Sequence, residues 1–473
     1  MKKIYSIVLV ALATLMFSSC VKDFLDIQPR GKEVPAKIDH YEGMLSHTTF
    51  SSLQTLSYPH QGEELCGDAN TMNRLLSVEK DCGLNAFKYE KAVYTDNLAS
   101  NEWNKCYSAI YTYNFVADNV MDSEGGTEQH KKELRAEARM RRAYSLFTAS
   151  LFFSPAYNEA TAATDLSIPI VTKADVTASG LTRNTVKEVY DFIIKEMTES
   201  VNDLPDKYNV LRVYSAAGWY MLGRVYWYKG DYANALAALR TSLEKANSIN
   251  GVGLLNFRSM SVNAKGYYAS FVAPEKSSET LSTMYYTASS LTSATGIPYH
   301  YLKPEYAAKY VAGDLRKNLI TEYTAGTGLY RPVTRAYTNL GGELPELYMM
   351  LAECEARVGS FDNAVTLMED YRKTRFADDA SAAVPAEAKA DKNSLVKFIL
   401  MERVLEYPAR GASVIDMKRL WNDPVVADRK AQMTHPIYEA GAVTETFSLA
   451  DISDLTWKIP STVMSFHSDW QNN

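Results

Sequence analysis

The sequence predicts a mainly α-helical fold, a tetratricopeptide-like helical-repeat scaffold that carries long irregular insertions. The first observation is residues 219–242, where apolar and small residues recur at helical spacing on both sides of Gly230, a helix breaker. The residues that carry this spacing are Trp219, Leu222, Gly223, Tyr226, Tyr232, Ala235 and Leu239. Their order is that of a tetratricopeptide repeat, in which two helices approach closely over small residues.

A second copy of the pattern occupies residues 347–368 and turns at Gly359. One repeat cannot bury its own apolar face, so a stable scaffold needs several. The two copies lie too far apart in the chain for a plain tandem array. We therefore expect repeat helices over about 103–247 and 344–420, with insertions between them.

The other helices follow from apolar periodicity and from signals at helix ends. Thr185 or Asn184 is expected to cap the helix that begins at Val186, and Pro205 ends it. We expect residues 38–473 to form a single domain. Outside the two repeats, helices are expected at 103–120, 133–153, 186–204 and 395–407.

Two long segments, about 51–100 and about 248–343, lack sustained periodicity and are the predicted insertions. Long ordered loops within a domain are usually functional. We therefore expect the binding site of the protein to lie in these two segments.

The N-terminus has the pattern of a secretion signal. Lys2 and Lys3 precede the apolar run 4–17, which is too short to span a membrane, and Ser18-Ser19-Cys20 follows. Small residues directly before a cysteine resemble a bacterial lipobox. We expect residues 1–19 to be removed, Cys20 to be lipidated, and residues 20–37 to form a tether. The alternative is an ordinary signal peptide that is cleaved nearby.

Composition narrows the function classes. The chain has 473 residues, 46% of them apolar and 22% charged, which is ordinary for a folded soluble domain. Its net charge of -6 gives no basic footprint for nucleic acid. Besides Cys20 there are four cysteines, of which Cys66 and Cys82 lie in one insertion and either pair or remain thiols.

Several motifs follow one another in a specific order along the whole chain. They are DFLD at 23–26, AEARMRRAYSLF at 136–147, TVKEVYDFIIKEM at 185–197, YKGDYANAL at 228–236, PELYMMLAECEARVG at 345–359, Glu402-Arg403, Asp416-Met417-Lys418-Arg419 and Lys458-Ile459-Pro460. Together with the lipobox, this order resembles the SusD/RagB family of nutrient-binding outer-membrane lipoproteins. The chain departs from the family at 410–413, where Arg-Gly-Ala-Ser replaces Glu-Gly-His-Arg, and lacks the usual Asn-Pro before Gln471-Asn472.

The resemblance implies a SusD-like fold and a binding function without catalysis. A member of this family is a cell-surface lipoprotein of the outer membrane of a Gram-negative bacterium, held by its lipid anchor only. It delivers an oligosaccharide or other nutrient to a SusC-like TonB-dependent transporter. The alternative from the repeats alone is a tetratricopeptide-type scaffold that binds a peptide or protein.

The residues themselves give little sign of catalytic chemistry. The seven histidines include no i, i+4 pair, and the chain has no HExxH, Cys-x-x-Cys or P-loop motif. Ser77-Val78-Glu79-Lys80 fits Ser-x-x-Lys, but its companion motifs are missing. We therefore expect no catalytic residue, metal or cofactor.

Tyrosine is concentrated in the second insertion, which contains eleven: 267, 268, 285, 286, 299, 301, 306, 310, 323, 330 and 337. Rigid aromatic rings bind at low entropic cost, and sugar rings present C–H faces to them. Alternation places Tyr299 and Tyr301 on one face of an extended segment. We predict a stacking platform formed by Tyr285, Tyr286, Tyr299 and Tyr301, with Asp68, Asn70 and Arg74 bonding hydroxyls at its edge.

Overall fold

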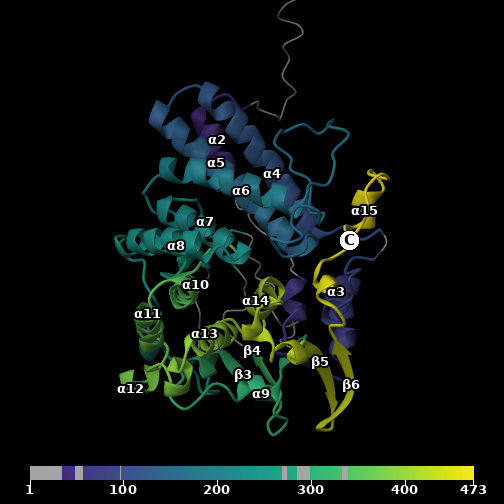
Figure 1. Cartoon of the computed structure of the whole chain (residues 1–473), viewed down its shortest axis with the longest axis vertical. Helices are drawn as coiled ribbons and strands as arrows, with labels where there is room; N and C mark the ends of the chain where they lie inside the picture. The colour runs from purple at the N-terminus through teal and green to yellow at the C-terminus, as the bar shows by residue number, and fades with distance from the viewer. Residues whose placement is uncertain (1–34, 48–56, 96, 269–273, 285–298, 333–338) are drawn as a thin grey trace, which may run out of the picture.

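The chain folds into packed helix pairs beside one mixed sheet, as a computed structural model shows (Figure 1). The helix pairs fill the upper and left parts of the view, and the strands lie below and to the right. The residues described are 35–47, 57–95, 97–268, 274–284, 299–332 and 339–473. The predicted mainly helical class is confirmed.

The N-terminal layer consists of four helices, and local signals set where three of them begin. The side chains of Ser100 and Thr127 accept from the backbone N–H groups of Trp103 and His130, and Thr185 forms a capping box with Glu188. The predicted cap at Thr185 is therefore confirmed, whereas the second long helix begins five residues before the predicted 133. The four helices are α2 (Ile38–Ser46), α4 (Asn101–Asn119), α5 (Glu128–Phe153) and α6 (Val186–Ser200).

The first predicted repeat forms a helical hairpin, α7 (Ser215–Lys229) and α8 (Tyr232–Asn247). Gly230 turns the chain with φ +85°, a conformation that favours glycine. A Cβ on Gly223 would lie 2.6 Å from Cδ2 of the fully buried Leu239. The absence of a side chain at position 223 therefore lets the two helices approach.

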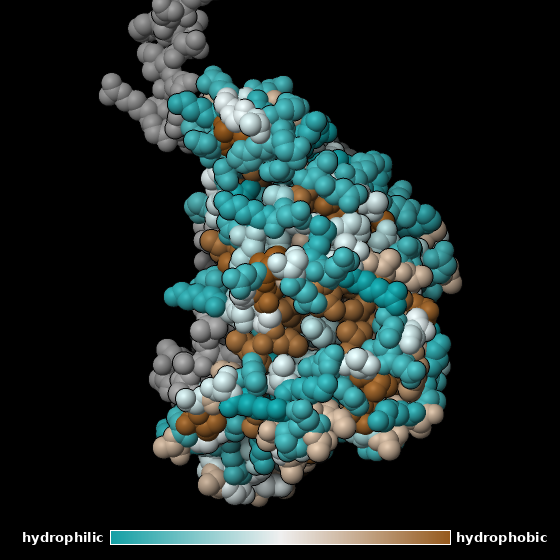
Figure 2. Space-filling model, turned by 90° about the vertical axis from the view of Figure 1, so that its left-hand side faces the viewer, coloured by the Kyte–Doolittle hydropathy of each residue, from teal (hydrophilic) through white to brown (hydrophobic). Residues whose placement is uncertain are grey.

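The second predicted repeat forms a similar hairpin, and further helices complete the scaffold. Figure 2 shows the side of the molecule that α8, α11 and α12 form, where apolar residues gather between the helices. Leu243, Tyr348 and Val365 are half-buried against the core of the scaffold. The helices are α10 (Leu344–Val358), α11 (Phe361–Lys373), α12 (Asp379–Ala382), α13 (Lys392–Glu406), α14 (Ala412–Leu420) and α15 (Ser461–Met464).

The insertions are more regular than the sequence predicted. The first contains a strand and a 17-residue helix, α3 (Thr71–Phe87), and the second contains three strands and the short helix α9 (Pro304–Ala307). The prediction of irregular insertions is wrong at these places. Helix α3 buries few apolar side chains, among them Leu75 and Phe87, so its periodicity is weak. The strands have two to four residues, too few for an alternating pattern.

The six-stranded sheet gathers strands from three distant parts of the chain. Its order is β3-β4-β2-β1-β5-β6, in which β1 pairs antiparallel with β2 and parallel with β5. The central strand β1 therefore joins the first insertion to the second insertion and to the C-terminal hairpin. The strands are β1 (Leu65–Asp68), β2 (Tyr301–Leu302), β3 (Ile320–Glu322), β4 (Tyr330–Pro332), β5 (Thr434–Glu439) and β6 (Ala442–Ser448).

Buried charges connect the helices of the scaffold. Arg403 on α13 donates to Asp416 at 2.9 Å and to Glu346 at 3.2 Å. Arg419 on α14 binds the same Asp416 at 3.0 Å and Glu353 at 2.6 Å. All five side chains are at least nine-tenths buried. We call this set the arginine network.

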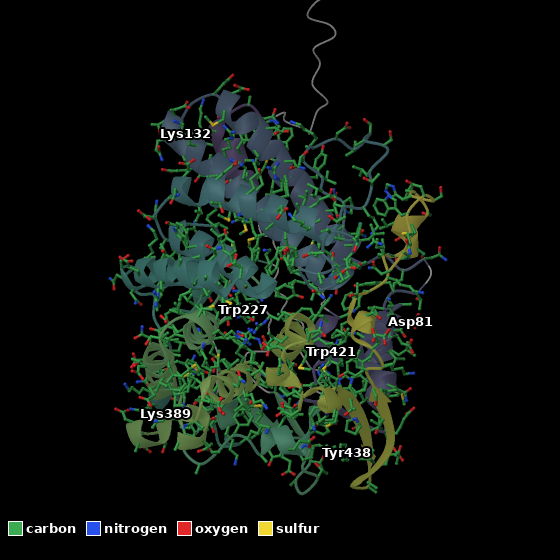
Figure 3. The ribbon with its side chains drawn as sticks, in the orientation of Figure 1. Asp81, Lys132, Trp227, Lys389, Trp421 and Tyr438 are labelled. Carbon is green, nitrogen blue, oxygen red and sulfur yellow. The ribbon has the colours of Figure 1, made fainter. Side chains whose placement is uncertain are left out.

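The arginine network also surrounds Trp227, which is labelled in Figure 3. The guanidinium of Arg419 lies 3.6 Å from the centroid of the Trp227 ring, and the indole N–H donates to Glu353 at 2.8 Å. The network therefore joins α7 to α10, α13 and α14.

Cys66 and Cys82 form no disulfide. Cys66 lies buried in β1, and burial raises the pKa of its thiol. In the part of the chain that the structure describes, no helix has the length and apolar character needed to cross a membrane.

Truncating the residue that fills the α7–α8 contact tests this packing. We expect Leu239→Ala to lower the free energy of unfolding by about 2–5 kcal/mol, because it leaves a cavity opposite Gly223. Ala235→Leu should cost about 1–3 kcal/mol through overpacking. Urea unfolding measures both values, and unchanged midpoints at both positions would contradict the packing.

Removing one charge from the arginine network tests its role. Asp416→Asn keeps the shape but leaves two buried guanidinium groups short of a carboxylate, so we expect a loss of about 3–5 kcal/mol in the free energy of unfolding. The matched control is Asp428→Asn, because Asp428 pairs with Lys397 at 3.1 Å on the exposed surface. Equal urea midpoints for the two variants would show that the network does not hold the helices together.

Candidate functional site

Asp68 brings together the polar residues that the sequence singled out. It ends β1, and the start of α3 follows at Thr71. One carboxylate oxygen accepts from the backbone N–H of Asn70 at 3.0 Å, from the hydroxyl of Thr71 at 3.1 Å and from the guanidinium of Arg74. The other oxygen accepts from the hydroxyl of Tyr301 at 3.0 Å. The two insertions therefore meet at this carboxylate.

The charges at this place are well defined. Burial alone would raise the pKa of Asp68, but the hydrogen bond and charge of Arg74, with the bond from Tyr301, hold the pKa below its usual range. Burial, followed by the nearby Asp68 charge, raises the pKa of Tyr301. At neutral pH the group therefore consists of a carboxylate, a guanidinium and a neutral phenol.

Two neighbouring tyrosine rings lie between two arginines, from α3 across to the hairpin formed by β3 and β4. The Arg74 guanidinium lies 5.8 Å from the centroid of the Tyr301 ring, and the Tyr301 and Tyr323 centroids are 5.6 Å apart. The Arg331 guanidinium lies 5.3 Å from the centroid of Tyr323. Such cation–ring contacts are favourable and fix the rings in place. We call Arg74, Tyr301, Tyr323 and Arg331 the Tyr–Arg ladder.

The tyrosine rings that are exposed in the ladder are not the rings that the sequence predicted to be exposed. Tyr301 is 1% exposed and Tyr299 is 4% exposed, so neither offers a face to a ligand. They also pack in separate apolar clusters. Tyr299 lies before strand β2, which begins at Tyr301, so the expected alternation along one strand does not apply to this pair. The structure thus corrects the prediction of Tyr299 and Tyr301 as an exposed pair. Tyr285 and Tyr286 lie outside the described residues.

The open ring on this face is one that the sequence did not single out. Tyr323 is 40% exposed and directly follows β3. Gly326 and Gly328, both with positive φ, form the turn that returns the chain to β4. In the sequence, two glycines between Tyr323 and Tyr330 could have predicted this hairpin. Asn70 is exposed beside Asp68, as its predicted role at an edge requires.

Tyr438 extends the same region on the other side of β1. It lies opposite Asp68 in the parallel pairing with β5, is half-buried, and is labelled on the sheet in Figure 3. The face therefore offers partly open tyrosine rings beside a carboxylate, a guanidinium and an amide. Such groups have the chemistry needed to stack on and hydrogen-bond a hydroxyl-rich ligand.

The buried histidines His435 and His300 pack against aromatic rings of the first insertion. His435 stacks between Phe87 and Tyr89, with both centroid distances 4.4 Å, and burial lowers its pKa to about 3. Burial also lowers the pKa of His300, which lies 5.1 Å from His60 between ring centroids. Over the described ranges, no group of three or more His, Cys, Asp or Glu side chains is placed to hold a metal ion.

Comparison with known proteins agrees with this architecture. A SusD-like family model, described as starch-binding associating with outer membrane, matches residues 23–227. No curated protein matches the sequence.

Solved structures with the same fold cover nearly the whole chain. A SusD superfamily protein from Bacteroides vulgatus has a TM-score of 0.70 at 17% identity, over 93% of this chain and 99% of its own. Another from Bacteroides thetaiotaomicron has a TM-score of 0.65 at 19% identity, over 92% and 99%. Surface glycan-binding protein A from Bacteroides uniformis has a TM-score of 0.63 at 16% identity, over 92% and 99%. The family match in the N-terminal part and the shared fold throughout confirm the predicted resemblance to the SusD/RagB family and the predicted SusD-like fold.

Proposed function

We propose that the protein binds oligosaccharides at the cell surface and delivers them to a SusC-like TonB-dependent transporter of the outer membrane. The observation that carries the binding proposal is the Tyr–Arg ladder, in which the open ring of Tyr323 lies against Tyr301, the residue that bonds the ionised Asp68. This proposal concerns binding without catalysis.

The ladder matches the chemistry of a sugar. A pyranose ring presents C–H groups that pack on an aromatic face, and its hydroxyl groups need donors and acceptors at the edge. Tyr323 supplies the ring, while Asp68 and Arg74 supply an acceptor and a donor that are 24% and 15% exposed. Because their mutual contacts already fix these side chains, little conformational entropy is lost when a ligand binds.

Similar proteins support the same class of ligand. The matching family is described as starch-binding, and one structural neighbour is a surface glycan-binding protein. These descriptions favour carbohydrate over the alternative of a peptide bound by a tetratricopeptide-type groove.

Delivery requires an anchor and a partner. Cys20 follows the apolar run and small residues of a lipobox, and two or three acyl chains on it would hold the protein stably, since a single chain binds a membrane only marginally. A binding protein that is only anchored cannot move its ligand inward. A transporter must therefore take the ligand from it.

Removing the open ring tests the binding face. We expect Tyr323→Ala to weaken the binding of an array-identified oligosaccharide by about 1–3 kcal/mol, by analogy with base stacking on aromatic rings. Its melting temperature should change little, because the ring is 40% exposed. The matched control is Tyr111→Ala, which removes an equally exposed ring on α4.

Isothermal titration calorimetry measures the affinities, and thermal unfolding checks the fold. Tyr301→Ala should instead lower the melting temperature, because Tyr301 is buried and bonds Asp68. Equal affinities for the Tyr323 and Tyr111 variants would place the binding site elsewhere.

Purification from the outer membrane tests the partner. We expect the tagged full chain, solubilised in detergent, to bring down one large β-barrel protein. Cys20→Ala should move the chain to the soluble fraction when the transporter gene is deleted, because the anchor is then lost. Recovery of soluble peptides alone would favour the peptide-binding scaffold.

A further inference from the structure

A second place in the molecule has the size of a ligand site. A cleft of about 900 Å³ opens between the segment after α5, the α7–α8 turn, the end of α14 and the last residues of the chain. Ligand pockets in proteins usually have about 300–1,000 Å³. In Figure 1 the region lies between α14 and the marked C-terminus. The cleft shares no residue with the Tyr–Arg ladder.

Two aromatic rings line the cleft. Tyr157 follows α5 and carries the ammonium of Lys229 at 4.5 Å from its centroid. Trp421 follows α14, is labelled in Figure 3, and carries the ammonium of Lys430 at 4.8 Å. Both rings are half-buried. Each ring is thus held by a lysine and remains partly open.

The charged groups of the cleft nearly balance. Its carboxylates accept hydrogen bonds from neighbouring groups: Glu159 from Tyr157, Asp165 from Thr161, Asp231 from Asn234 and Asp423 from Arg357. Its cations are Lys91, Arg183, Lys229, Lys418 and Arg419. The helices α5, α7 and α14 end here and α8 begins here, so three negative dipole ends and one positive end also contribute to the balance. The cleft therefore favours neither a strong anion nor a strong cation.

Lys418 contributes only part of a positive charge to the wall. Its ammonium donates to the backbone carbonyls of Leu151 at 2.7 Å and of Leu455 at 2.9 Å. Burial lowers the pKa of Lys418 to about 7. Near neutral pH this side chain is therefore only partly charged.

The exposed groups at the rim are mostly amides and hydroxyls. Asn158, Asn422, Ser453 and Gln471 line the cleft and are exposed. Amide side chains both donate and accept hydrogen bonds, as the hydroxyl groups of a sugar require. Rings, amides and a balanced charge together suit a neutral polyhydroxylated ligand.

We infer that this cleft is a second saccharide-binding site, for neutral oligosaccharides, in which Trp421 and Tyr157 contact sugar rings and Asn422 and Asn158 bond their hydroxyl groups. The inference rests on the proposed carbohydrate-binding function and adds a site apart from the ladder. It gives the protein two points of attachment to one chain or to two chains of a polysaccharide.

Titration of the full chain in detergent with a neutral oligosaccharide chosen from a glycan array tests the inference. We expect two binding events for the unmodified protein. Trp421→Ala should weaken one of them by about 5- to 150-fold, as for a lost stacking ring. Tyr323→Ala should weaken the other. Asp428→Ala changes an exposed residue close to Trp421 in sequence but outside the cleft and should change neither.

A blocking variant covers the case in which Trp421→Ala unfolds the protein. Ser453→Trp adds bulk at the exposed rim and removes no ring, so it should abolish the cleft event and leave the melting temperature unchanged. The same oligosaccharide carrying a photoreactive diazirine should label peptides that contain residues 155–166 or 418–423.

The outcomes separate this inference from the proposed function. A single binding event that Tyr323→Ala removes, and that Trp421→Ala and Ser453→Trp leave intact, overturns the second site while carbohydrate binding stands. Absence of binding to any oligosaccharide overturns both. Loss of the cleft event in Ser453→Trp, with labelling at 418–423, establishes the second site.

Discussion

The structure depends on a few arginine side chains that are buried together with carboxylates. Arg403 and Arg419 share Asp416, and each reaches a different carboxylate on α10, Glu346 or Glu353. Removing charges from water is costly, so such groups are stable in a core only when each is paired with good geometry. That requirement permits few arrangements of α7, α10, α13 and α14. The network thereby fixes the helical scaffold on which both proposed binding surfaces are built.

The part of the scaffold around α13 and α14 also holds the sheet in position. Glu64, which directly precedes β1, accepts from the hydroxyl of Ser413 at 2.6 Å and from the backbone N–H of Ala409 at 3.1 Å. Burial raises the pKa of Glu64. Its neighbour Glu63 binds Arg429 at 2.5 Å. The chain around α13 and α14 therefore holds the start of β1, and β1 in turn carries Asp68 to the Tyr–Arg ladder.

Helical periodicity predicted the scaffold but not the sheet. The hairpin at Gly230 and the capping at Thr185 could be predicted because both depend on neighbours in sequence. The sheet could not, because β1 pairs with strands more than 200 residues away and each of these strands is short. Asp68 and Arg74 of the first insertion lie beside Tyr301 of the second, and the sequence predicted residues of these two insertions to form one site. Which tyrosines are open could not be predicted, because exposure depends on what packs over each ring: Tyr301 is covered and Tyr323 is not.

In the proposed function, a helical scaffold presents fixed rings and polar groups to carbohydrate. The measurement that tests it most directly is binding of the purified full chain to one array that carries neutral and acidic oligosaccharides together with peptides. We expect concentration-dependent binding to a related set of oligosaccharides and none to the peptides. Binding to peptides with no oligosaccharide signal would contradict it.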